Sequence, residues 1–176
     1  VLESNKYLKL NFNGGDLSSD AGLLLIKEFA YKLGFVNILK KEFKTSDSAS
    51  FRFHKDDENL WQVIYQILGA YFEDDCADEL TNDPVLTAIL SKKVLASQPT
   101  LSRFFNRMDE ATLNQFYDLM RRFRKVVYSV KKPEMLLLDL DSTLLNTYGH
   151  QEGEGFNFHY QNRGYHPLVC YDGITG

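Results

Sequence analysis

The feature that most constrains this chain is an apolar run, residues 136–143, that ends in two carboxylates and two hydroxyls. Its sequence is Leu-Leu-Leu-Asp-Leu-Asp-Ser-Thr. Side chains of a strand alternate between faces, so Asp139 and Asp141 are expected to point the same way. Because an unpaired carboxylate is costly to bury, a pair at a strand end indicates a metal site or proton chemistry. The structural alternative is a strand-end turn with a capping Asp, although this is a poor turn sequence.

The rest of the pattern predicts helices first and strands afterwards. Helices are expected over residues 21–33, 35–43, 56–72, 83–91, 97–107 and 109–127. In the third, the apolar spacing predicts a buried face of Leu60, Val63, Ile64, Ile67, Leu68 and Tyr71. In the last, it predicts Leu113, Phe116, Tyr117, Met120, Phe123 and Val127. Strands are expected over residues 7–12, 135–141, 144–148 and 165–171.

This order predicts an α+β fold with two parts. Residues 1–130 would form a mainly helical N-terminal region, and residues 131–176 the first strands of a sheet. A hydrophobic content of 44% and an aromatic content of 14% are ample for a real core. The only cysteines, Cys76 and Cys170, are too few for a disulfide framework and favour reduced thiols in a cytoplasmic protein. No apolar stretch approaches the ~20 residues that span a membrane, so we expect no membrane partner.

Two kinds of phosphate chemistry compete for the carboxylate pair. Carboxylates are hard oxygen ligands suited to Mg²⁺, and two such ions can assist an in-line displacement at phosphorus. Alternatively, Asp139-Leu-Asp-Ser-Thr143 resembles the first motif of haloacid-dehalogenase-type phosphatases, which implies Asp139 as nucleophile and Asp141 as acid/base. That motif usually opens its domain, however, whereas here it follows about 130 mostly helical residues.

A second resemblance covers more of the chain. Asp141-Ser-Thr, Tyr148-Gly-His-Gln-Glu-Gly153, Tyr165-His-Pro-Leu168 and Tyr171-Asp-Gly173 resemble, in this order, the DDE transposases of bacterial insertion sequences. The chain looks most like their insertion-sequence thirteen-eighty family. Upstream, the resemblance extends to residues 19–25, 71–75, 83–84 and 97–104.

This resemblance implies an RNase H-like mixed sheet, incomplete here, behind a helical region. It implies DNA cleavage and strand transfer that depend on Mg²⁺ or Mn²⁺, with transposon ends and target as double-stranded DNA partners, and a homodimer of the full-length protein. By motif match, Asp141 is the first catalytic carboxylate and a metal ligand, and Asp139 supports it. The later Asp and Glu of the triad are expected beyond Gly176, so we expect this chain alone to be inactive. A non-catalytic DNA-binding module derived from a transposase is a further alternative.

Two regions are candidates for DNA contact, although the net charge of −4 argues mildly against a general nucleic-acid binder. The helix that opens at Pro99 carries Ser102, Arg103 and Arg107, and a helix N-terminus with hydroxyl and guanidinium groups suits phosphate. A basic block contributes Arg121, Arg122, Arg124 and Lys125, which could neutralise phosphates or could be solvated cations at a helix end.

Overall fold

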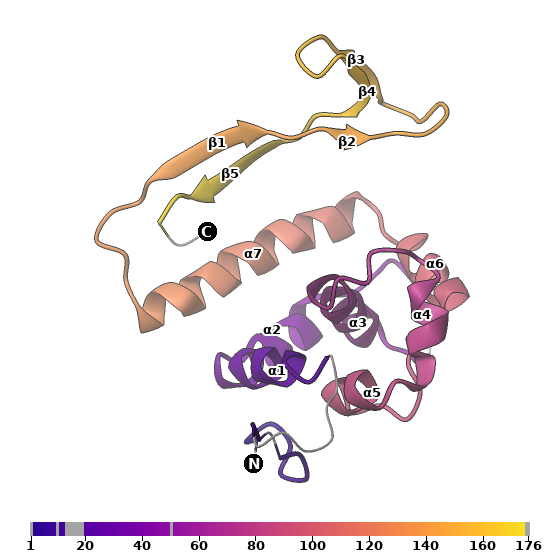
Figure 1. Ribbon diagram of the computed structural model, residues 1–176, viewed down its shortest axis with the longest axis vertical. Helices are drawn as coiled ribbons and strands as arrows, with labels where there is room; N and C mark the ends of the chain where they lie inside the picture. Colours follow the sequence, from indigo (N-terminus) through magenta and orange to yellow (C-terminus); the bar gives the residue numbers. More distant parts are fainter. Residues whose placement is uncertain (1, 10, 13–19, 50, 175–176) are drawn as a thin grey trace. The chain divides into compact units, whose positions relative to one another are not determined.

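The computed structural model describes residues 2–9, 11–12, 20–49 and 51–174 (Figure 1). The chain forms two compact units, Val1–Val130 and Lys131–Gly176. The first unit is helical and the second contains strands, so the protein mixes helix and strand as an α+β fold does. No helix among the described residues is long and apolar enough to cross a membrane.

The first unit is built from seven α-helices and one short 3₁₀ turn in the described part of the chain. They are α1 Leu23–Lys32, α2 Phe35–Glu42, α3 Asp56–Leu68, α4 Cys76–Glu79, η1 Leu80–Asn82, α5 Pro84–Leu90, α6 Gln98–Phe105 and α7 Glu110–Val130.

Local sequence explains several of the helix ends. Asp83 caps α5, since its Oδ1 accepts hydrogen bonds from the backbone N–H of Val85 at 2.9 Å and of Leu86 at 2.7 Å. Gly34 lies between α1 and α2 with φ of 72°, a left-handed conformation that glycine adopts without steric cost. These signals confirm helix boundaries that the sequence predicts.

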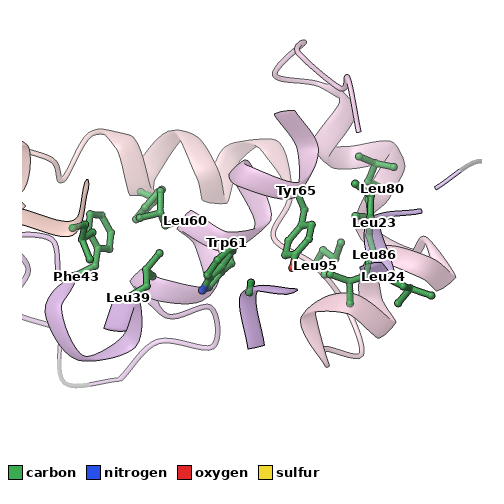
Figure 2. Packing of buried hydrophobic residues seen from close by; sticks show 14 of the residues in the cluster. Leu23, Leu24, Leu39, Phe43, Leu60, Trp61, Tyr65, Leu80, Leu86 and Leu95 are labelled. Carbon is green, nitrogen blue, oxygen red and sulfur yellow. The ribbon is translucent and has the colours of Figure 1, made fainter. Parts of the chain in front are cut away.

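The core of the first unit joins side chains from helices that lie far apart in the sequence (Figure 2). Trp61 and Tyr65 of α3 pack with tilted rings, their centroids 5.7 Å apart and their planes at 34°. Around them gather leucines of other elements, among them Leu24, Leu39 and Leu86, which are all buried. Burial of such side chains contributes roughly 1.5–3 kcal/mol each, so this cluster is the main source of the unit's stability.

The buried face of α3 differs from the predicted one. Ile67 and Leu68 are about half exposed, whereas Asn59, Gln62 and Gln66 are buried. Gln62 is satisfied by Ala96: its Nε2 donates to the Ala96 carbonyl at 2.7 Å, and its Oε1 accepts from the Ala96 N–H at 2.8 Å. An amide side chain whose polar atoms are hydrogen-bonded can be buried at little cost. The buried face of α3 therefore includes polar residues, which hydrophobic periodicity does not predict.

The predicted inner face of α7 is also only partly right. Phe116 and Phe123 pack against the core, and the buried residues of this helix are Thr112 and Leu119. The remaining four residues of the predicted face, Leu113, Tyr117, Met120 and Val127, are exposed. The core therefore contacts a narrower stripe of α7 than the sequence predicts.

The second unit contains five short strands in two antiparallel sheets. They are β1 Leu138–Ser142, β2 Leu145–Asn146, β3 Gly155–Asn157, β4 Asn162–Tyr165 and β5 Leu168–Asp172. β1 pairs with β5, and β4 lies between β2 and β3. Figure 1 shows β1 and β2 following one another along one side of a ribbon, with β4 and β5 returning along the other.

The strands depart from the prediction in three ways. Every pairing in the described part of the chain is antiparallel, so the expected mixed sheet is not present there. β3 and the start of β4 lie within residues 149–164, between two of the strands predicted above, and the two pair as a hairpin. No strand forms in the described part of residues 7–12, because Leu8 instead donates its N–H to the Asn5 carbonyl in a turn.

Candidate functional site

β1 places the two predicted carboxylates on one face of its sheet. In the register with β5, Asp139 lies opposite Tyr171 and Asp141 lies opposite Val169. Residues directly opposite in an antiparallel pair share a face, and alternate residues of a strand do so too. Asp139, Asp141, Val169 and Tyr171 therefore share one face, and Leu138 and Leu140 belong to the other.

Both carboxylates are exposed in the structure, as are the leucines of β1. The sequence predicts a metal site here on the assumption that these carboxylates are buried. Because both are exposed, their burial cost is not evidence for a site here. The Asp141 Oδ1 accepts a hydrogen bond from the Ser142 N–H at 2.8 Å, which fixes one oxygen beside its own backbone. The pair remains accessible to a ligand.

The donor set of this face suits a hard cation but is incomplete. Carboxylate oxygens are the ligands that Mg²⁺ prefers, and Asp139 and Asp141 supply two such groups on one strand. Among the residues that the structure describes, no three His, Cys, Asp or Glu side chains form a group that could hold a metal ion. A complete metal site therefore needs further ligands.

The backbone just after Asp141 is held by a residue that the sequence does not single out. Tyr160, in the turn between β3 and β4, donates its hydroxyl to the Ser142 carbonyl at 2.7 Å. The Thr143 N–H donates to the Pro167 carbonyl at 3.2 Å. No local motif signals these contacts, because Tyr160 and Ser142 are 18 residues apart.

The helix α6 carries two of the predicted DNA-contact residues on its surface. Ser102 and Arg103 are exposed, and Arg103 donates through Nη2 to Thr100 Oγ1 at 3.3 Å. The N-terminus of α6, predicted to suit phosphate, already has an acidic partner: the Gln98 N–H donates to the Asp78 Oδ1 at 2.9 Å. A carboxylate therefore stands where a phosphate was expected.

Arg107, predicted to contact DNA, is engaged inside the first unit. Its Nη2 donates to the Asp56 Oδ1 at 2.9 Å, its Nε to the Thr45 Oγ1 at 3.2 Å, and its Nη1 to the Arg103 carbonyl at 2.9 Å. The side chain is only 15% exposed, and its Nε also lies 3.4 Å from an oxygen of Asp47. This arrangement favours a structural role for Arg107.

The basic block of α7 presents exposed cations in two different settings. Arg121 pairs with Asp118 one turn earlier, and Arg122 pairs with the Glu42 Oε1 at 3.0 Å. Arg124 and Lys125 are exposed and have no ion pair within the part of the chain that the structure describes. Exposed pairs contribute only about 0–1 kcal/mol, so Arg121 and Arg122 can exchange their partners for phosphate.

Comparison with known proteins identifies one matching family. The family model described as "Transposase DDE domain group 1" matches residues 2–176. No curated protein and no solved structure is significantly similar to the chain. The match favours a transposase and gives no support to the phosphatase alternative that the Asp139 motif suggests.

Proposed function

Since the chain belongs to the transposase DDE domain group 1 family, we propose that it forms the DNA-binding and first catalytic part of a metal-dependent transposase. The reaction would be hydrolysis of phosphodiesters at the ends of an element, followed by attack of the freed 3′-hydroxyl on target DNA. Within the family, we assign the chain to the transposases of bacterial insertion sequences, of the thirteen-eighty type. The proposed cellular location is the cytoplasm.

In this proposal, Asp141 is the first catalytic carboxylate and a metal ligand. This role is supported by the position of Asp141 near the end of β1 and by the exposure of its side chain. Asp139, on the same face two residues earlier, would support the site. Mg²⁺ or Mn²⁺, when bound, would supply Lewis-acid activation of the attacking oxygen and charge neutralisation at the phosphate. Two carboxylates fill only part of an octahedral ligand set, so water, phosphate oxygens or further acidic residues would complete it.

The fold proposal follows the same assignment. Residues 131–176 would begin an RNase H-like catalytic domain, with β1 as the strand that carries the first acid. Residues 1–130 would form the helical DNA-binding region, and the full-length protein would act as a homodimer on double-stranded DNA. Arg103, Arg121, Arg122, Arg124 and Lys125 would contact phosphates, which their exposure supports. Ser102 is exposed next to Arg103 on α6, whereas Arg107 would have a structural role.

The observation that carries the proposal is the match of one transposase family over residues 2–176, together with an exposed carboxylate pair on one strand face. The test is Mg²⁺-dependent nicking of DNA with element ends by the full-length protein. We expect Asp141→Asn to abolish nicking and Asp139→Asn to reduce it. Glu134→Gln is the matched control, because Glu134 is an exposed acid just before β1. Unchanged nicking by Asp141→Asn would refute the proposal.

DNA binding can be tested separately with the present chain. A gel-shift titration at low salt should show binding to element ends, weakened by Arg103→Ala and by Arg121→Ala. Absence of any binding at low salt would contradict the proposed DNA interface.

A further inference from the structure

We infer that Tyr160 is a positioning residue for Asp141, an inference that rests on the proposed function. Asp141 is followed by Ser142, and the Ser142 carbonyl accepts the hydroxyl hydrogen bond of Tyr160 at 2.7 Å. The same hydroxyl lies 3.3 Å from the Ser142 Oγ. One side chain from a distant turn thus holds both the backbone and the side chain of the residue next to the proposed catalytic acid.

The peptide that follows β1 is held at both of its polar groups. The carbonyl oxygen of this peptide belongs to Ser142 and accepts the Tyr160 hydroxyl hydrogen bond. The N–H of the peptide belongs to Thr143 and donates to the Pro167 carbonyl at 3.2 Å. The Ser142 N–H in turn donates to the Asp141 Oδ1 at 2.8 Å. The Asp141 carboxylate is therefore bonded to the very residue that Tyr160 holds, so a shift of Ser142 would move the carboxylate.

This support is needed because Ser142 is the last residue of a short pairing. Ser142 and Leu168 form the end of the β1–β5 register, and the next strand pair, β2–β4, starts at Leu145. The ends of strands open more easily than their centres. A hydrogen bond from outside the ladder at this position reduces that opening next to Asp141.

Tyr160 is itself held in a defined orientation. Its ring stacks on the His166 ring, with centroids 6.0 Å apart and planes 10° apart. Its backbone N–H donates to the Asn157 Oδ1 at 3.3 Å, at the end of β3. His166 directly precedes Pro167, whose carbonyl accepts the Thr143 N–H. The segment that contacts the Tyr160 ring is therefore the same one that is hydrogen-bonded to the end of β1.

The hydroxyl supports Asp141 without covering it. Because side chains alternate along a strand, the Ser142 Oγ belongs to the face opposite Asp141. Tyr160 approaches that Oγ, and the Asp141 side chain remains exposed on the other face. Loss of a group that hydrogen-bonds a metal ligand typically costs about 10–100-fold in metal affinity or activity. The Ser142 N–H is that partner of Asp141, and Tyr160 holds Ser142, so we expect an effect at the low end of this range.

The test compares two tyrosines of the full-length protein in DNA nicking as a function of Mg²⁺ concentration. Tyr160→Phe keeps the ring and removes only the hydroxyl. Tyr165→Phe is the matched control, because the Tyr165 hydroxyl also donates to a backbone carbonyl at 2.7 Å, that of Glu152, away from β1. We expect Tyr160→Phe to raise the Mg²⁺ concentration for half-maximal nicking about tenfold, with DNA affinity unchanged and the rate recovered at saturating Mg²⁺. Tyr165→Phe should titrate like the parent protein.

Asp141→Asn in the same assay separates the two proposals. If Asp141→Asn is inactive and Tyr160→Phe shows the parent Mg²⁺ dependence, the positioning role is overturned and the proposed function stands. If Asp141→Asn nicks normally, the proposed function fails and the inference fails with it. A lower melting temperature for Tyr160→Phe than for Tyr165→Phe, with no recovery at saturating Mg²⁺, would show that the hydroxyl serves folding alone and would also overturn the inference.

Discussion

Arg107 and Asp56 form a charged hydrogen bond, from Nη2 to Oδ1 at 2.9 Å, that joins the end of α6 to the start of α3. Both side chains are about 15% exposed. The Thr45 N–H and hydroxyl each donate to the other oxygen of Asp56 at 2.8 Å. Every polar atom that Asp56 offers is therefore paired, and this pairing makes an ion pair with little exposure tolerable.

We expect Arg107→Ala to destabilise the first unit by about 2 kcal/mol, because it leaves a poorly solvated carboxylate without its cation. Arg121→Ala is the control, since Arg121 pairs with Asp118 on an exposed face and its loss should change stability by less than about 0.5 kcal/mol. Urea unfolding followed by Trp61, the only tryptophan and a buried one, measures both variants. Equal effects of the two substitutions would contradict the structural role of Arg107.

Asp56 should also make stability depend on pH. Burial opposes ionisation of this carboxyl, but the hydrogen bonds from Thr45 and Arg107 outweigh it and hold its pKa below the usual range. A carboxyl whose pKa is depressed by folding stabilises the protein above its unfolded pKa of about 3.9, and this stabilisation is lost as the pH falls through the folded value. Unfolding free energies between about pH 5 and pH 2 should therefore fall less steeply in Arg107→Ala than in the parent chain. Parallel curves would refute this linkage.

Gln62→Leu should destabilise the first unit although it replaces a polar residue with an apolar one. The leucine would leave the Ala96 N–H and carbonyl without partners in a buried site, at roughly 1–3 kcal/mol for each group. Gln151→Leu, at an exposed position, should have little effect. The free energy of unfolding from the Trp61 signal measures the difference. A stability of Gln62→Leu equal to that of the parent would show that this amide is dispensable.

The double variant Arg124→Ala/Lys125→Ala should weaken DNA binding and its dependence on salt. Each phosphate contact contributes about 0.9 to the slope of log K against log salt concentration, so the slope should become shallower by about 1.8. Lys6→Ala/Lys9→Ala removes the same charge from two exposed lysines near the N-terminus and should leave the slope unchanged. A slope change of equal size in both variants would indicate a general charge effect instead of contacts on α7.

The sequence predicts best those features that depend on neighbouring residues. Asp83-Pro84 starts a helix because an Asp oxygen can accept the first free N–H groups and proline has none to satisfy. Trp61, a large apolar side chain within the predicted helix 56–72, is buried. The strand around Asp139 and Asp141 is also present, although it begins at Leu138 instead of Met135.

The buried face of a helix was harder to predict than the position of the helix in the sequence. Hydrophobic spacing in α3 favours Ile67 and Leu68 as core residues, yet Gln62 is buried in a pair with Ala96, 34 residues away. In the same way, Arg107 looks like a surface cation in the sequence, and only the fold brings Asp56 and Thr45 to it. Polar partners that meet through the fold leave no periodic signal in the sequence.

By itself, then, the sequence determined the order of helices and strands, the family resemblance and the presence of two acids on one strand face, because each depends on local spacing. Tertiary structure decided which helix faces are buried, that Asp139 and Asp141 are exposed, and that the Tyr160 hydroxyl bonds the backbone beside Asp141. These properties depend on contacts between distant segments, whose geometry is set by packing and by the pairing of buried polar groups.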